Sequence, residues 1–213
     1  MDYPCFHEIV ACARQKVRRY GMATVAECVL AIPDSEAARR ETALVETILS
    51  GQRDFRWLDH STGWFWFSDT TRNRAVNRLR KMLAVANPLT IDEIHAGLAR
   101  MGVPLAPDKT LVEFCRQVPG LAIEGDRVKA DPAIEIHAVL NRTEQDIFRL
   151  LSEHDGCMSN SDLIDRSHVL GMKRPTLYQC VSHSPIVSRY KRSYYRLVGS
   201  LRHEEGALIC GAS

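Results

Sequence analysis

The chain has 213 residues, of which 45% are hydrophobic, and a formal net charge of +2. This composition allows several small hydrophobic cores, whereas the total charge alone does not indicate a nucleic-acid-binding protein. No apolar run is long enough to cross a membrane, and the N-terminus lacks a charged segment followed by an apolar one, so we expect a cytoplasmic protein without membrane insertion.

Residues 1–69 are predicted to form three helices followed by a β-hairpin. Apolar residues recur at helical spacing in the first helix, and two aromatic runs flank a polar turn that contains Gly63. We expect helices at Phe6–Val17, Thr24–Ala31 and Ser35–Leu49, and strands at Phe55–Asp59 and Trp64–Phe67.

Residues 70–130 are predicted to repeat this order, with Asp108 as the N-cap of the third helix. We expect helices at Arg72–Ala86, Thr90–Met101 and Asp108–Gln117, and strands at Leu121–Glu124 and Arg127–Lys129. The segment Ala130–Asn141 is predicted to be a linker.

Residues 142–199 are predicted to form a third unit, and 200–213 a loose tail. Pro175 suits the first turn of its third helix, because proline has no N–H that a helix start would need to satisfy. We expect helices from Thr143 to Leu151, from Ser159 to Leu170 and from Pro175 to Ser182, and strands at Pro185–Tyr190 and Tyr194–Val198.

One short sequence motif, the capping motif, marks the start of the second helix in each unit. It places a threonine or serine three residues before an acid, and the capping residues Thr24, Thr90 and Ser159 lie 66 and 69 residues apart. Such a pair satisfies free N–H groups at a helix start. Its recurrence in one context predicts three tandem winged helix-turn-helix domains, an α+β fold that is mainly α with small β-hairpin wings.

The third unit resembles a known class of domain. Its segments Gly171–Tyr178, Ser184–Ile186 and Tyr195–Gly199 are similar to bacterial winged helix-turn-helix domains of the HARE type and to modules like region 4 of sigma factors. The resemblance is clearest over this unit. It implies DNA binding, or attachment to DNA-handling machinery, in transcription or defence proteins, and it implies no particular reaction.

The charge is strongly segregated along the chain. Eight lysines and arginines and no acid lie between Arg166 and His203, so this segment carries +8 and the rest of the chain −6. We expect Lys173 and Arg174, at a helix N-terminus, to meet phosphates or base edges together with Thr176 and Gln179. The wing is expected to grip the flanking backbone through Arg189, Lys191, Arg192 and Arg196. A solvated basic surface is the alternative.

A second cationic block lies at the start of the second unit. Its members are Arg72, Arg74, Arg78, Arg80 and Lys81, of which Arg74, Arg78 and Lys81 fall on one helical face. We expect Arg72, Arg74, Arg78 and Lys81 to bind DNA phosphates. The alternative is that acids of the first unit, such as Asp54, Asp59 or Asp69, neutralise this helix.

The first unit has a different character, because its predicted wing holds all three tryptophans, Trp57, Trp64 and Trp66. Alternation along the strand makes both of its faces aromatic. One face can pack on its own unit, and the other is expected to contact the second unit, a second copy of the chain or a partner protein.

The sequence contains no phosphate-binding loop, nucleotide-binding glycine motif or hydrolase signature. The seven cysteines are scattered and form no CxxC pair, and no complete set of metal ligands is apparent, so we expect no cofactor and no metal. The main hypothesis is therefore a non-enzymatic double-stranded DNA-binding protein, either a bacterial transcriptional regulator or a factor associated with mobile elements or defence. The alternatives are a winged-helix protein-interaction scaffold and a nuclease or recombinase subunit.

Overall fold

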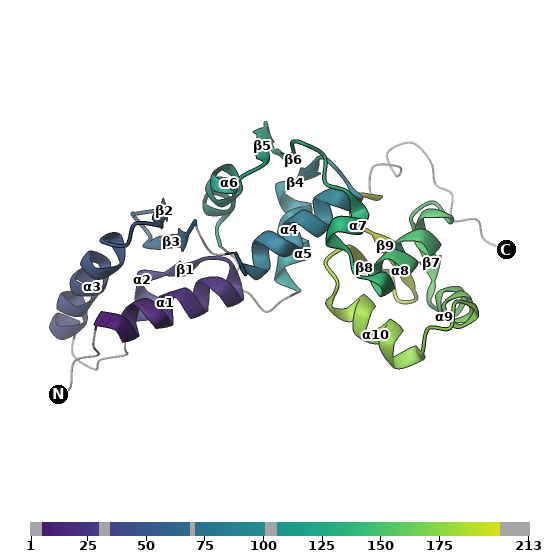
Figure 1. Cartoon of the computed structure of the whole chain (residues 1–213), viewed down its shortest axis with the longest axis horizontal. Helices are drawn as coiled ribbons and strands as arrows, with labels where there is room; N and C mark the ends of the chain where they lie inside the picture. Colours follow the sequence, from purple (N-terminus) through teal and green to yellow (C-terminus); the bar gives the residue numbers. More distant parts are fainter. Residues whose placement is uncertain (1–5, 30–34, 69–70, 101–105, 201–213) are drawn as a thin grey trace. The chain divides into compact units, whose positions relative to one another are not determined.

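The computed structural model describes residues 6–29, 35–68 (backbone only for 35–40), 71–100 and 106–200. Its architecture is mainly helical, with three small antiparallel sheets in three successive helix-then-hairpin repeats (Figure 1). The predicted fold class is thus confirmed. By their contacts the residues group into two compact units, Met1–Asn77 with Pro104–Leu121, and Arg78–Val103 with Ala122–Ser213.

The first repeat has a core of fully buried aromatic rings in its hairpin, chiefly Phe65 and Phe67. Its sheet has the strand order β1-β3-β2. The elements are α1 (Phe6–Tyr20), β1 (Ala23–Thr24), α2 (Val25–Cys28), α3 (Ser35–Ser50), β2 (Phe55–Asp59) and β3 (Trp64–Phe67).

The predicted second helix of this repeat, Thr24–Ala31, is too long. Helix α2 ends at Cys28 because Val29 adopts extended backbone angles, and its N–H closes the last turn on the carbonyl oxygens of Val25 and Ala26. Residues 30 and 31 lie outside the described part of the chain.

The second repeat follows the same order, and its sheet has the strand order β4-β6-β5. Its elements are α4 (Arg74–Val85), β4 (Leu89–Thr90), α5 (Ile91–Ala99), α6 (Asp108–Gln117), β5 (Leu121–Glu124) and β6 (Arg127–Ala130). The prediction that Asp108 caps α6 is wrong. The N-cap is Pro107, because its carbonyl oxygen already accepts the first helical bond, from the N–H of Leu111.

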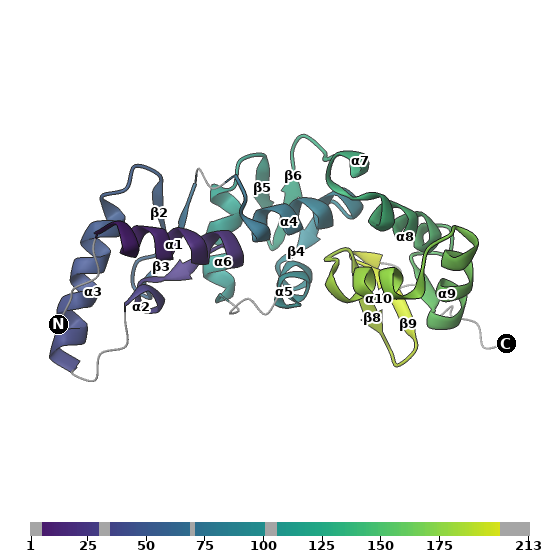
Figure 2. The same ribbon diagram turned by 60° about the horizontal axis from the view of Figure 1, so that its bottom comes forward.

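The third repeat is preceded by the short helix α7 (Ile136–Val139) within the predicted linker. Its sheet has the strand order β7-β9-β8, and α10 contacts β8 (Figure 2). The elements are α8 (Arg142–Ser152), β7 (Cys157–Ser159), α9 (Asn160–Val169), α10 (Arg174–His183), β8 (Val187–Tyr190) and β9 (Tyr194–Leu197). Of the predicted tail, residues 201–213 lie outside the described part.

The repeated capping motif caps the N-terminus of the second helix in each repeat. Thr24 and Thr90 form complete capping boxes with the glutamates three residues on. Ser159 accepts a bond from the N–H of Asp162, and its hydroxyl also donates to that carboxylate. The predicted caps are therefore confirmed.

The same capping motif also fixes the register between the hairpin and the short strand before the second helix. Each capping residue pairs with the first residue of the last hairpin strand, as Thr24 with Trp64, Thr90 with Arg127, and Ser159 with Tyr194. In each repeat the next residue then donates its N–H to the carbonyl oxygen of the residue before that strand: Val25 to Gly63, Ile91 to Asp126, and Asn160 to Ser193. One local pattern thus sets the helix start and the strand register together.

Candidate nucleic-acid interface

Helix α10 carries two cations at its N-terminus. Lys173 is the N-cap, Arg174 is the first helical residue, and the first turn contains no acid. Both side chains are exposed. Because a helix N-terminus carries a partial positive charge, each cation there costs about 0.3–1 kcal/mol, and a bound anion would offset that cost.

The exposed surface of α10 has two flanks. Leu177 and Val181 are buried against the rest of the repeat. Helical spacing places Thr176, Gln179 and His183 on one flank, whereas Arg174 and Tyr178 lie on the other, and all five are exposed.

The first flank lines a cleft. A cavity of about 540 Å³ lies between this flank of α10, the middle of α4 and the start of α8. It unites predicted contact residues from both cationic blocks, namely Arg78, Lys81, Thr176 and Gln179. All of its lining residues belong to the compact unit that contains the third repeat.

A buried carboxylate fixes the shape of this cleft. The Glu144 side chain is 4% exposed, and its Oε2 forms an ion pair with Lys81 Nζ at 2.6 Å. Its Oε1 accepts from the Ser184 hydroxyl at 2.8 Å, and its Oε2 also accepts from the N–H of Asn141 at 3.1 Å. Arg78 donates to the carbonyl oxygen of His183 at 2.6 Å. These bonds tie α4, α8 and the end of α10 together.

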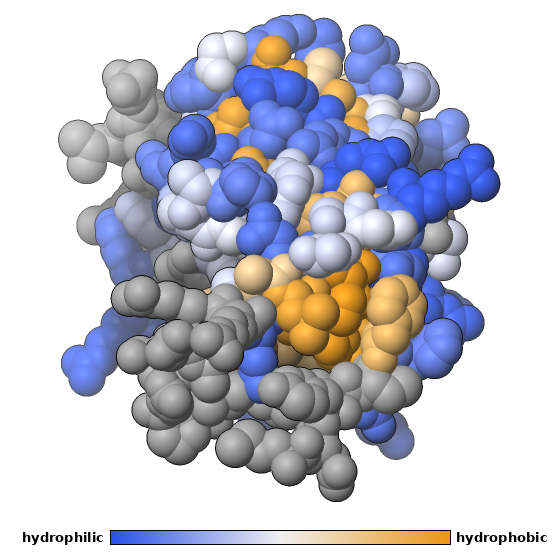
Figure 3. All heavy atoms as spheres, turned by 90° about the vertical axis from the view of Figure 1, so that its left-hand side faces the viewer, coloured by the Kyte–Doolittle hydropathy of each residue, from blue (hydrophilic) through white to orange (hydrophobic). Residues whose placement is uncertain are grey.

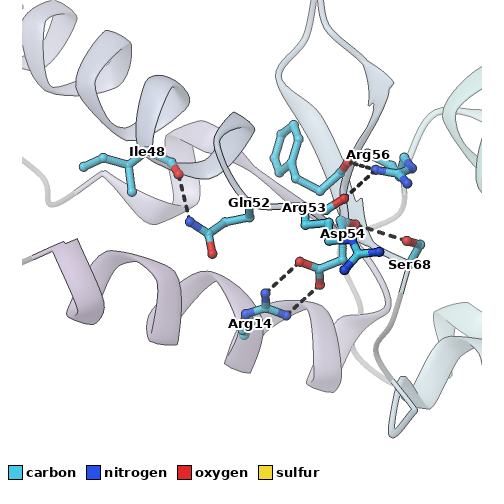
Figure 4. Close-up of polar contacts among 8 residues, drawn as sticks. Arg14, Ile48, Gln52, Arg53, Asp54, Arg56 and Ser68 are labelled. Carbon is cyan, nitrogen blue, oxygen red and sulfur yellow. Dashed lines mark hydrogen bonds and ion pairs between the residues drawn. The ribbon is translucent and has the colours of Figure 1, made fainter.

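The predicted DNA-binding cations in and before α4 therefore differ in their surroundings. The charge of Lys81 is matched by Glu144 of the third repeat, so Lys81 shapes the cleft more than it attracts an anion. Of the acids of the first repeat, Asp54 forms a two-bond ion pair with Arg14 of α1, at 2.7 and 2.8 Å (Figure 4), and Asp59 Oδ2 lies 4.0 Å from Lys109 Nζ. Asp69 lies outside the described part of the chain. Arg72 and Arg74 are exposed and belong to the other compact unit.

The cations of the third wing lie on two faces of the hairpin. Arg189 is paired with Tyr195 and Arg196 with Ser188, and residues paired in this way share a face, so neighbouring pairs lie on opposite faces. Arg189, Lys191 and Arg192 are exposed. Arg196 is half-buried, with its guanidinium 4.6 Å from the centre of the Tyr190 ring. Only the first three extend from the wing toward solvent.

Within the described part of the chain, the seven lysines and arginines from Arg166 to Arg196 form no ion pair with an acid. The eighth cation of the sequence segment, Arg202, lies outside the described part. Six of these seven cations are exposed, and exposed cations without an acidic partner are the electrostatic feature that phosphate backbones bind.

Two residues of this surface were not among those predicted from the sequence. Arg142 is exposed and lines the cleft at the first position of α8. The sequence feature that could have identified it is the Asn141–Glu144 capping box, which has the same spacing as the three predicted capping motifs. Tyr178 is 41% exposed on the outer flank of α10, and a Leu-Tyr pair in a helix gives no sign of which ring faces solvent.

Two tryptophans of the first hairpin, Trp57 and Trp66, make contacts within their own compact unit. Trp66 is 2% exposed, donates its indole N–H to Gln117 at 2.7 Å and lies edge-on to Phe114 of α6. Gln117 also donates to the carbonyl oxygen of Trp57, at 2.9 Å. Trp57 and Trp64 are half-buried. The predicted contact with a helix of the second repeat is thus present.

A different apolar area is exposed on this unit. Figure 3 shows hydrophobic side chains gathered on one face of it, and its exposed large apolar residues include Phe6 of α1 and Leu44 of α3. A protein-interaction role for the first repeat therefore has these two residues, more than the tryptophans, as its structural basis.

The described residues contain no group of three or more histidines, cysteines or acids arranged to hold a metal ion. Burial raises the pKa of the Cys180 thiol beside the cleft to about 11, with nearby Glu144 contributing, and burial raises that of Cys115 to about 12. Both thiols stay protonated near neutral pH, which is the opposite of an activated nucleophile.

No protein-family model and no curated protein matches this chain. Among the described residues, no helix combines the length and the apolar character that a membrane crossing requires. The repeated winged-helix-like architecture is therefore the basis for its classification.

Proposed function

We propose that the chain is a non-enzymatic double-stranded DNA-binding protein that uses the third repeat as its main contact surface. The observation that carries this proposal is the N-terminus of α10, where Lys173 and Arg174 are exposed without an acid in the first turn. A bound phosphate or guanine edge would offset the unfavourable interaction between these cations and the helix dipole.

The cleft supports the same proposal. Arg78 and Arg142 line it beside Thr176 and Gln179, next to the exposed start of α10. In this arrangement α10 would enter the major groove, and a flanking phosphate would lie at the cleft mouth near Arg142. Arg189, Lys191 and Arg192 on the wing would contact the neighbouring backbone. The resemblance of this repeat to bacterial HARE-type and sigma-region-4-like domains supports a role in transcription, or in mobile-element or defence systems.

The test is the double variant Lys173→Glu/Arg174→Glu, measured by fluorescence anisotropy on a random-sequence duplex at two salt concentrations. We expect at least a 100-fold loss of affinity at the lower salt, since two phosphate contacts become two repulsions. The matched control is Arg18→Glu/Arg19→Glu on α1, which changes the net charge equally at two exposed positions. If the first variant binds within threefold of the wild type, α10 is not the recognition helix.

A second candidate function, a protein-interaction scaffold, is favoured by the exposed apolar area of the first repeat. The scaffold function predicts weak DNA binding that does not depend on the DNA sequence. Both charge-reversal variants should then reduce that binding equally. The same titration therefore distinguishes the two functions.

A further inference from the structure

A second cavity, also of about 540 Å³, lies between α5 and the third hairpin, away from the cleft at α10. Its walls come from Ala96 and Arg100 of α5 and from the segment that runs from Arg196 to Gly199. These residues all belong to one compact unit. The cavity has no part in the proposed DNA contact through α10.

Two arginines share this cavity without an acidic partner. Arg100 donates to the carbonyl oxygens of Ala96 and Val187, and Arg196 donates to the Ser188 hydroxyl. No ion pair between either arginine and a carboxylate occurs within the described ranges. Burial lowers the pKa of Arg100, and the charge of Arg196 lowers it further. Two cations in partial desolvation therefore repel each other here.

The acids that line the cavity do not relieve this repulsion. The carboxylate of Glu93 accepts bonds from the N–H and the hydroxyl of Thr90 as part of the α5 cap. Asp92 is exposed in the first turn of α5, where the helix terminus favours it. Arg127, a third cation, also lines the cavity.

We propose that this cavity binds a small organic anion. Its carboxylate or phosphate group would lie between the guanidinium groups of Arg100 and Arg196, which suit such groups because they can donate two parallel bonds. Its apolar part would contact Ala96, Leu197 and Val198, which supply the apolar lining. Neutralising two like charges in a half-buried site makes the anion more favourable there than on an exposed arginine.

Such a ligand would stabilise the docking of the third hairpin on the second repeat. Two contacts already hold them together, the bond from Arg100 to Val187 and the close approach of Gly199 to Ala86. Gly199 has a φ of +78°, and a Cβ there would collide with the Ala86 side chain. Because the cavity is lined from both sides of this junction, an anion in it would bridge α5 and the hairpin.

The experiment is isothermal titration calorimetry of the full chain, without DNA, with phenyl phosphate and with inorganic phosphate at constant ionic strength. We expect phenyl phosphate to bind at least tenfold more tightly than inorganic phosphate, because only the former fills the apolar part. Arg100→Gln and Arg196→Gln should each weaken phenyl phosphate at least tenfold, whereas Arg80→Gln, on an exposed cation of α4, should leave it within twofold. Two separate variants are needed because Arg100 also supports the hairpin, and circular dichroism verifies that each is folded.

Three results would overturn the proposal. The first is no binding of phenyl phosphate at millimolar concentration. The second is equal affinity for the two phosphates, or a folded Arg196→Gln variant that binds within threefold of the wild type. The third is displacement of phenyl phosphate by an equimolar DNA duplex, which would assign the cavity to a nucleic-acid phosphate instead of a free anion. The inference does not depend on the proposed DNA binding, since no duplex is present in the main titration.

Discussion

Trp66 of the first hairpin and Arg196 of the third occupy equivalent positions, two residues after the strand residue that pairs with the helix cap. Trp66 is 2% exposed and bonded to Gln117 of α6. Arg196 is half-buried, lies over the Tyr190 ring and shares a cavity with Arg100. The same backbone position thus completes a core in one repeat and lines a charged cavity in the other.

The neighbouring position shows the same contrast. Phe65 is fully buried and stacks on Phe55 at 5.1 Å, whereas the equivalent Tyr195 is half-buried beside Arg189. The winged-helix-like topology is therefore compatible with either a packing hairpin or a cationic one. The side chains, and not the topology, determine which repeat is available to a partner.

The largest expected effect on stability is at the equivalent positions Phe65 and Tyr195. Phe65→Ala should lower the free energy of unfolding by about 3–5 kcal/mol, because it leaves a cavity in an aromatic core. Tyr195→Ala should cost only about 1 kcal/mol. Urea denaturation followed by circular dichroism measures both. Similar costs for the two would mean that the hairpins contribute equally to folding.

The third repeat relies instead on a buried ion pair. Lys81→Met should cost about 2–3 kcal/mol, because Glu144 would be left charged at 4% exposure without its cation. Adding Glu144→Leu should recover at least half of that loss, since two apolar residues can replace a buried pair. Thermal and urea unfolding of the single and double variants give the coupling. A double variant that is less stable than Lys81→Met would show that Glu144 acts mainly through Ser184 and Asn141.

A smaller effect is expected for the polar end of Trp66. Trp66→Phe removes the indole N–H and leaves Gln117 Oε1 without that donor, at a cost of about 1–2 kcal/mol. Trp64→Phe, at a half-buried position in the same strand, should change stability by less than about 0.5 kcal/mol. Chemical denaturation of the two variants makes the comparison. Equal losses would show that ring volume, rather than the bond to Gln117, matters at position 66.

The smallest effect on folding is expected in the exposed part of the third wing. Arg189→Ala should change stability by no more than about 0.5 kcal/mol. It should lower DNA affinity a few-fold at all sequences and reduce the salt slope by about one, the signature of one lost phosphate contact. Anisotropy titrations over a series of salt concentrations measure the slope. A loss that depends on DNA sequence would place Arg189 on a base edge.

The local elements were predictable because their signals are short-range. The strands Phe55–Asp59, Trp64–Phe67 and Leu121–Glu124 agree with the sequence prediction residue for residue, since each is bounded by a turn and rich in strand-forming residues. The errors at Asp108 and at the end of α2 are boundary errors, which depend on backbone bonds that the side chains do not specify.

The candidate site was only partly predictable. Lys173 and Arg174 were recognised because they lie at a predicted helix N-terminus, where the helix dipole disfavours cations unless an anion binds there. The cleft was not, because Arg78 and His183 are 105 residues apart in the sequence and meet only in the folded chain. Arg142 was missed although the Asn141–Glu144 capping box is a local signal for the start of α8.

The sequence alone determined three repeats, their helix caps and the accumulation of positive charge in the third, because each of these depends on residues within one turn or one hairpin. The tertiary structure decided which of those cations remain available. It pairs Lys81 with Glu144, turns Arg196 toward Arg100 and leaves Lys173, Arg174 and Arg189 exposed. Pairing and desolvation act over a few ångströms in space, and sequence separation does not report that distance.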